Sequence, residues 1–302
     1  MSKINTLFMI IKKPRKIIKL LGDKRFFDWI PDKQYLKLVY WGETGKKLNI
    51  KAPNTFNEKL QWLKLYDRKS EYNIYVNKHA VRSFIAETIG EKYLIPLIDV
   101  YNSVEEIDWD VLPNKFVLKC THGSGSNIIC SDKDKFEIEE AKKKLKKWMN
   151  KNWYWFGREW PYKNIKPRII SEKYLQGNIT DYKFMCFHGE PKLIQIHRNR
   201  GSKDRTLDFY DIDWNKTEIR RKMPTAKELI PKPDNLEEML EVARKLSKNE
   251  VHCRIDLYEV KGKVYFGEKT LYTASGFSEF AKEKYDELLG SWIKLPIDSD
   301  TV

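Results

Sequence analysis

The stretch HCRIDLYEVKGKVYFGEKTLYTASG, residues 252–276, decides the fold. Two arms, 251–260 and 264–268, carry β-branched and aromatic residues, as strands do. Lys261-Gly262 between them is compatible with a turn. We therefore predict that this stretch forms one β-hairpin.

Three charged residues of this hairpin suggest chemistry. Facing arms would bring Asp256 and Glu268 side by side, and two neighbouring carboxylates repel unless a cation or a shared proton intervenes. Mg²⁺ is bound by one or two such carboxylates, together with waters and nucleotide phosphates. Arg254 points to the same face as Asp256, where its charge can stabilise a developing anion. A surface hairpin with alternating charges is the alternative on this stretch alone.

The composition indicates a folded, enzyme-like protein. With 302 residues, 41% of them hydrophobic and 13% aromatic, the chain can bury a large core in two or three lobes. The four cysteines are scattered without CxxC spacing, so we predict reduced thiols of an intracellular protein and neither a disulfide framework nor a zinc site. They are Cys120, Cys130, Cys186 and Cys253.

The net charge of +14 is concentrated near the beginning of the chain. Residues 1–25 hold eight lysines and arginines against Asp23 alone, so the charge does not predict nucleic-acid binding. Such a basic amphipathic segment suits an anionic membrane surface or a biosynthetic complex. An ordinary solvated helix is the equal alternative. The segment lacks both an apolar run of roughly 20 residues and a cleavage site, so we expect a cytoplasmic protein, at the inner face of the membrane if the segment binds it.

The middle of the chain contains a candidate phosphate loop. We predict a helix over 76–89 and an apolar strand over 93–100, followed by KFVLKCTHGSGSNIIC at 115–130. There a strand ends in Lys119, and Gly123 and Gly125 permit backbone amides to surround phosphate oxygens. A plain hairpin loop is the alternative.

Three later segments complete the pattern. The aromatic run WYWFGREWPY at 153–162 predicts core between two lobes, with a sugar or base face as the alternative. A strand over 167–175 and a hairpin over 181–197, turning at 188–191, follow. The basic stretch 198–213 suits an acidic glycan or is a solvated loop.

These motifs occur in an order that resembles a known family. DYKFMCFHGEPKLIQI, RID and YFGE resemble the ATP-grasp fold, and LQWLKLYD, FVLKCTHGSGS, GREWPYKNIKPRIISEKYL and GEKTLYTASGF are similar to the TupA-like ATP-grasp family, from about residue 55 to about 295. The resemblance implies an α+β fold, in which two antiparallel-sheet lobes clasp ATP beside a helical N-terminal region. It divides the chain into a basic helical region at 1–75, an ATP-grasp domain at 76–295 and a tail at 296–302. The small lobe spans about 113–172 and the large lobe about 176–295.

The resemblance also implies a set of site residues. Arg254 and Lys183 match catalytic positions that face the acyl-phosphate and the phosphates. The nucleotide is implied to contact Lys78, Lys119, His122, Gly123, Ser124, Gly125, Ser126, Glu172, Lys173, Tyr174 and Leu175. Two Mg²⁺ ions are implied at Asp256, Glu268 and Thr270. Thr270 stands where many members have asparagine, and a hydroxyl is the weaker metal ligand.

The implied activity is an ATP-dependent carboxylate–amine ligase that forms an amide through an acyl-phosphate. TupA-like proteins are associated with teichuronopeptide and capsular polysaccharide synthesis. The carboxylate would then belong to an acidic glycan, a sugar nucleotide or glutamate, and the amine to an amino acid or another amine. Three alternatives stay open: a glycosyltransferase, suggested only by common DxD patterns, a kinase of the same fold, and a catalytically inactive glycan-binding protein.

Overall fold

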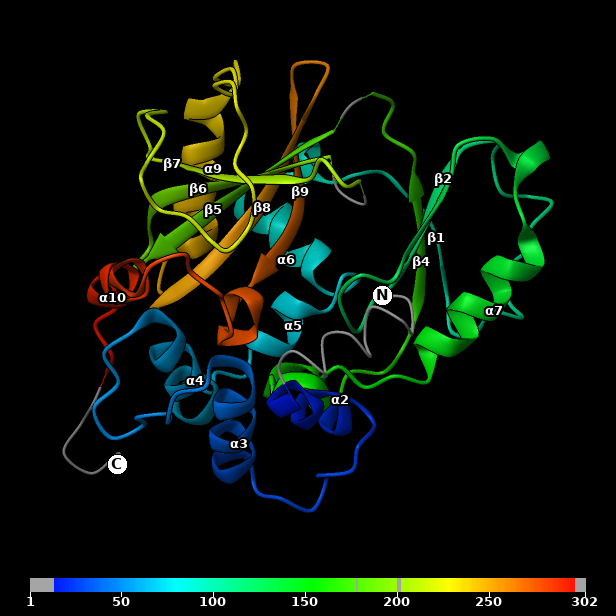
Figure 1. The fold of residues 1–302 in the computed structure, drawn as a ribbon. Helices are drawn as coiled ribbons and strands as arrows, with labels where there is room; N and C mark the ends of the chain where they lie inside the picture. Colours follow the sequence, from blue (N-terminus) through cyan, green and yellow to red (C-terminus); the bar gives the residue numbers. More distant parts are fainter. Residues whose placement is uncertain (1–13, 178, 200–201, 297–302) are drawn as a thin grey trace.

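Two antiparallel β-sheets organise the chain (Figure 1). This computed structural model describes residues 14–177, 179–199 and 202–296. The four-stranded sheet has the order β1-β4-β2-β3, and the five-stranded sheet has the order β7-β6-β5-β8-β9. The strands are β1 Leu97–Tyr101, β2 Phe116–Cys120, β3 Asn127–Cys130, β4 Ile169–Lys173, β5 Thr180–Phe187, β6 Glu190–Arg198, β7 Thr206–Tyr210, β8 His252–Val260 and β9 Lys263–Thr270. The predicted α+β class with two antiparallel sheets is confirmed.

Helices precede the sheets and connect their strands. The N-terminal group is η1 Pro14–Lys16, α2 Ile17–Asp23, α3 Asp32–Thr44, α4 Phe56–Tyr66, α5 Tyr72–Val76 and α6 Val81–Thr88. The others are η2 Glu91–Tyr93, η3 Lys133–Lys135, α7 Ile138–Met149, α8 Tyr154–Gly157, η4 Trp160–Tyr162, α9 Leu236–Ser247, η5 Thr273–Gly276 and α10 Glu283–Ser291. Helix α4 starts at a capping box in which Thr55 and Glu58 each bond the other's backbone N–H.

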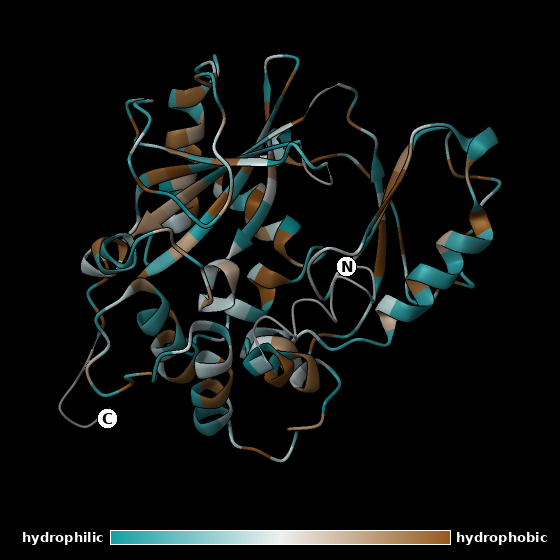
Figure 2. Cartoon of the chain, viewed as in Figure 1, coloured by the Kyte–Doolittle hydropathy of each residue, from teal (hydrophilic) through white to brown (hydrophobic). Residues whose placement is uncertain are grey.

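The buried hydrophobic side chains of the described residues form two separate cores. The larger core joins the five-stranded sheet and α9 to the N-terminal helices, through side chains such as Leu36, Phe56 and Ile255. The smaller core lies between the four-stranded sheet and α7, around Leu118 and Leu145. Figure 2 shows α7 as mostly hydrophilic, in keeping with a helix that buries only a narrow stripe. The N-terminal helices therefore share one hydrophobic core with the five-stranded sheet, whereas the four-stranded sheet has a separate core.

Both predicted hairpins of the five-stranded sheet are confirmed. Strands β8 and β9 meet at Lys261 and Gly262, whose φ angles of 52° and 71° lie in the left-handed region. Strands β5 and β6 turn in the same way at His188 and Gly189, with φ angles of 52° and 83°. Two-residue turns with positive φ match the twist of antiparallel strands, and glycine adopts this conformation without steric cost.

Two predicted elements were wrong in their extent. The helix predicted over 76–89 is interrupted, because the Asn77 side-chain oxygen accepts bonds from the backbone N–H groups of His79 and Ala80, at 3.0 and 3.2 Å. This turn competes with the helix and leaves Lys78 in a loop between α5 and α6. The strand predicted over 93–100 forms only at Leu97–Tyr101, after Pro96, which has no N–H to donate.

The basic segment at 1–25 is described only in part. Residues 1–13 lie outside the described residues, as do residues 297–302 of the predicted tail. Within the described part of the chain, no helix combines the length and the apolar character that crossing a membrane requires.

Candidate functional site

The two acidic residues of the β8–β9 hairpin face each other because of a β-bulge. The turn pairs Val260 with Lys263, and uninterrupted pairing from there would place Gly267 opposite Asp256. Instead the register shifts after Leu257, and Asp256 pairs with Glu268. Since paired residues of an antiparallel ladder point to the same face, this one extra residue turns Glu268 toward Asp256.

Arg254 lies between the two carboxylates. Its Nε and Nη2 donate to the two oxygens of Asp256 at 2.6 and 2.8 Å, and Nη2 also donates to Glu268 Oε1 at 2.9 Å. Thr270, paired with Arg254 across the hairpin, donates from Oγ1 to the same Glu268 oxygen at 3.1 Å. The structure thus brings together the predicted catalytic arginine and the three predicted metal ligands.

Lys183 completes the cluster from the neighbouring strand β5. It pairs with Asp256 in the ladder, and its Nζ forms ion pairs with Asp256 and, at 2.9 Å, with Asp181. Burial raises the pKa of Asp256, although Arg254 and Lys183 oppose this shift. Burial also disfavours the charged form of Glu268, but Arg254 and Lys78 outweigh that cost and lower its pKa to about 2. Glu268 is therefore ionised at neutral pH.

A second charged cluster lies on the four-stranded sheet. Glu172 on β4 is almost buried and accepts from Arg82 Nη1 at 3.0 Å, while Lys119 Nζ on β2 lies 2.6 Å from its other carboxylate oxygen. Lys78 donates its Nζ hydrogen to the carbonyl oxygen of Gly123 in the loop after β2. Burial lowers the pKa of Lys78, although Glu268 opposes this shift. Lys78 thus lies close enough to Glu268 for their charges to interact.

The predicted phosphate loop connects β2 and β3, as expected. Ser124 and Gly125 at its tip are exposed, and Gly125 has a φ of 73°. Ser126 is buried and donates to the carbonyl of Cys120 at 3.5 Å. His122 is also buried, and its Nε2 lies 3.2 Å from the carbonyl oxygen of Trp148 at the end of α7. The structure therefore places His122 against the end of α7.

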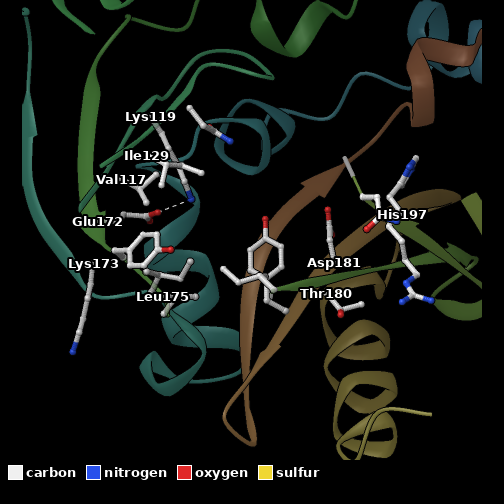
Figure 3. A pocket seen from close by; sticks show the side chains of 16 residues that line it. Val117, Lys119, Ile129, Glu172, Lys173, Leu175, Thr180, Asp181 and His197 are labelled. Carbon is white, nitrogen blue, oxygen red and sulfur yellow. Dashed lines mark ion pairs between the residues drawn. The ribbon is translucent and has the colours of Figure 1, made fainter. Parts of the chain in front are cut away.

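A cavity of about 510 Å³ separates the two sheets. Figure 3 shows Lys119, Glu172 and Lys173 on one side of it and Asp181 and His197 on the other. The predicted linker residues Lys173, Tyr174 and Leu175 line it as well. A narrow cavity of about 30 Å³ shares Lys119 and Glu172 with the first and is also lined by Lys78 and Glu268. Glu268 therefore lines the same narrow cavity as Lys119 and Glu172, and these two residues also line the larger cavity between the sheets.

The family model that describes TupA-like ATP-grasp proteins matches residues 58–294. The chain belongs to the TupA-like ATP-grasp family. No curated protein sequence matches this chain.

Solved ATP-grasp-type ligases are similar to this chain at low identity. A D-alanine–D-alanine ligase from Bacillus anthracis complexed with ATP has 16% identity and a TM-score of 0.40, with 66% of this chain and 55% of that chain covered. An L-amino acid ligase from Bacillus licheniformis has 14% identity and a TM-score of 0.44, with 82% and 57% covered. An N5-carboxyaminoimidazole synthetase from Staphylococcus aureus complexed with ADP has 12% identity and a TM-score of 0.43, with 74% and 53% covered. This TupA-like chain thus spans little more than half the length of each.

The hairpin carboxylates of this TupA-like protein suit Mg²⁺ only if other ligands complete its coordination. Asp256 and Glu268 face each other with Thr270 beside them, and hard oxygen ligands of this kind suit Mg²⁺. No group of three or more histidine, cysteine or acidic side chains suited to a metal ion occurs among the residues that the structure describes. The donor set therefore suits an ion that takes its remaining ligands from phosphates and water.

Sequence reasoning missed two charged residues of this TupA-like site. Asp181 lies two residues before Lys183 on the same strand, so strand periodicity alone indicated that both point to the same face of the sheet. Arg82 carried no comparable signal, because its place beside Glu172 depends on how α6 packs against the four-stranded sheet.

Proposed function

We propose that this TupA-like protein is an ATP-dependent carboxylate–amine ligase that forms an amide through an acyl-phosphate. The observation that carries the proposal is that Glu268, which faces Asp256, lines a narrow cavity together with Lys119 and Glu172, two residues that also line the larger cavity. Membership of the ATP-grasp family supports the same reading. Residues 76–295 would form the ATP-grasp domain, with the N-terminal helices as its support.

The cavity is proposed to hold ATP. Its volume of about 510 Å³ lies within the usual range for small-molecule sites. Residues 172–175 would contact adenine, and Lys119 and Lys78 would contact the phosphates under the loop 122–126. In this structure Lys119 pairs with Glu172, and Lys78 donates to the carbonyl oxygen of Gly123. Bound phosphates would replace these oxygens as the partners of the two lysines.

Asp256, Glu268 and Thr270 are proposed to hold Mg²⁺, as two ions. When bound, Mg²⁺ would neutralise and orient the phosphate oxygens during phosphoryl transfer. Arg254 would release the carboxylates it now bridges and turn its guanidinium to the transferred phosphoryl group. Lys183, which stays paired with Asp181, would keep the buried Asp256 charge compensated.

The reaction needs no nucleophile from the protein. The acceptor carboxylate attacks the γ-phosphorus of ATP, the bond to the bridging oxygen breaks, and ADP and an acyl-phosphate result. An amine then attacks the acyl carbon, phosphate leaves with the carbon–oxygen bond pair, and the amine loses a proton to give the amide. Arg254 and Lys183 stabilise the negative charge that develops in both steps.

An acidic acceptor is proposed to enter beside Arg254 on the side of Arg221. The segment around Arg221 is held by an isolated antiparallel bridge to Phe280, which lies between η5 and α10. Burial lowers the pKa of Arg221 to about 10; Arg254 and Arg205 add to the lowering, as neighbouring cations do, and Glu279 opposes it. Three guanidinium groups near one another suit the carboxylate of an acidic glycan, a sugar nucleotide or glutamate. The amine would be an amino acid or a similar compound.

One assay separates this function from its competitors. The protein is mixed with Mg²⁺, ATP, UDP-glucuronate or an acidic glycan, and pooled amino acids, and products are identified by mass spectrometry. ADP, phosphate and an amide together support the ligase. Release of UDP would indicate a glycosyltransferase, and a stable phosphorylated product without free phosphate would indicate a kinase. No nucleotide turnover with any acceptor would overturn the proposal.

We also propose peripheral contact of residues 1–25 with an anionic membrane or a biosynthetic complex, which would place the enzyme at the cytoplasmic face. Phe26 and Trp29, just beyond this segment, are 65% and 80% exposed and would add apolar contacts. Removal of residues 1–25 should reduce cosedimentation with phosphatidylglycerol vesicles. Equal partition of the truncated and full chains would dispose of the membrane contact.

A further inference from the structure

Helix α4 carries a row of buried polar side chains that the proposed chemistry does not use. Asn57, Gln61 and Lys64 are 2%, 0% and 0% exposed and lie on one face of the helix. All three bond the segment that follows β9. Asn57 exchanges bonds with Ser278, and Gln61 donates to the carbonyls of Ser275 and Gly276 at 3.1 and 2.8 Å.

Lys64 joins two segments that are distant in sequence. Its Nζ donates to the carbonyl oxygen of Gly157 at 2.7 Å and to the carbonyl and hydroxyl oxygens of Ser275 at 2.8 and 2.9 Å. A fourth oxygen, Gln61 Oε1, lies at 3.1 Å. Gly157 packs so tightly here that a methyl group at that position would lie 2.1 Å from Ser275 Oγ. Through these hydrogen bonds Lys64 connects the aromatic segment 153–162 with the segment after β9.

The segment that Lys64 holds has an unfavourable backbone. Ala274 and Ser275 have φ angles of 50° and 53°, in the left-handed region, which is unfavourable for a residue with a side chain. Such a conformation persists only when its surroundings determine it. Besides Lys64 and Gln61, Thr273 is tied to His252 on β8 through a contact of 3.3 Å.

The charge of Lys64 is compensated by buried groups. Its close partners are oxygens with lone pairs to accept its hydrogens, which suits an ammonium group. Burial lowers the pKa of Lys64 to about 7, and Glu159 opposes the shift. Burial raises the pKa of Glu159, and Lys64 opposes that shift in turn. Each of the two charges therefore stabilises the other inside the protein.

We propose that Lys64 is a positioning residue for the reaction centre. By holding Ser275 against Gly157, it fixes the left-handed turn at 273–276 and, through the short connection 271–272, the end of β9 that carries Glu268 and Thr270. The inference rests on the proposed function for its catalytic consequence. Its structural part, the order of the turn, stands independently of that function.

The test is Lys64→Met, which keeps most of the side-chain volume and removes every donor. If Lys64 positions the centre, kcat falls by about 100-fold, the loss expected for a misplacement of about 1 Å, while the KM for ATP changes by less than about threefold. Hydrogen exchange of the amides at 271–278 becomes faster, and exchange in β2 and β3 stays unchanged. The same signature, weaker, is expected for Gln61→Leu, which removes two bonds to the turn without changing charge.

Lys59→Met is the matched control on the same helix. Lys59 donates to the carbonyls of Gly290 and Ile293 at 2.8 and 2.7 Å, near α10 and away from the turn. It should lose stability but keep kcat and the exchange pattern at 271–278. If Lys64→Met and Gln61→Leu keep kcat and exchange as Lys59→Met does, the proposal is overturned. If the wild type shows no ligase turnover, the proposed function fails, and the exchange data still decide whether Lys64 orders the turn.

Discussion

Gly267→Ala tests whether the bulge of the β8–β9 hairpin orients the carboxylate pair. Gly267 is the residue that shifts the register and places Glu268 opposite Asp256. A Cβ atom at this position would lie 2.9 Å from the Tyr258 ring and 3.0 Å from the carbonyl oxygen of Asp256. The ring can turn away, but the carbonyl belongs to the ladder, so the bulge itself has to move.

Overpacking of this kind typically costs about 1–3 kcal/mol. We therefore expect Gly267→Ala to lower the free energy of unfolding by that amount, measured by urea denaturation followed by tryptophan fluorescence. The displaced carbonyl is that of Asp256, so the carboxylate pair shifts with it. ATP turnover should then fall more than tenfold, whereas the affinity for ATP without Mg²⁺ should change little.

Deletion of Gly267 is the informative companion. Without the bulge, regular pairing from the turn places Glu268 opposite Asp256 again, so the deletion should retain more turnover than Gly267→Ala. A Gly267→Ala protein with wild-type stability and turnover would refute the steric argument. A deletion variant less active than Gly267→Ala would refute the argument from register.

Four further predictions follow from the same geometry. Glu268→Gln should abolish nucleotide turnover with little change in the circular dichroism spectrum, because glutamine keeps the size of the side chain and removes only its charge; full turnover would remove the metal assignment. Lys119→Ala should weaken ATP binding about tenfold or more by calorimetry, since it removes a phosphate-facing cation; unchanged affinity would count against the cavity. Arg221→Gln should raise the KM for the acidic acceptor and leave the KM for ATP unchanged; the reverse pattern would place the acceptor elsewhere. Burial lowers the pKa of His252 from 6.5 to about 3, so below about pH 6.5 this imidazole binds a proton in the unfolded chain but not in the folded protein. As the pH is lowered from the unfolded to the folded pKa value, the free energy of unfolding should fall by about 1.4 kcal/mol per pH unit. An unchanged slope in His252→Gln would show that another group titrates.

Local patterns in the sequence were sufficient for much of this protein. Both hairpins of the five-stranded sheet were predictable, because strand alternation and two-residue turns are local properties. The strand–loop–strand around Lys119 was predictable for the same reason. The chemistry-bearing residues Arg254 and Asp256 were predictable as neighbours on one strand face. Motif order then indicated the family, which the match over residues 58–294 confirmed.

Tertiary structure alone decided how these pieces meet. Counting from the turn places Gly267 opposite Asp256, and only the bulge brings Glu268 there, since one extra residue reverses which face a side chain occupies. The bonds of Lys64 to Gly157 and Ser275 join positions 93 and 211 residues away, a separation that no local pattern encodes. Partners so far apart in the chain are chosen by packing, because a buried donor takes whichever acceptors the folded core places beside it.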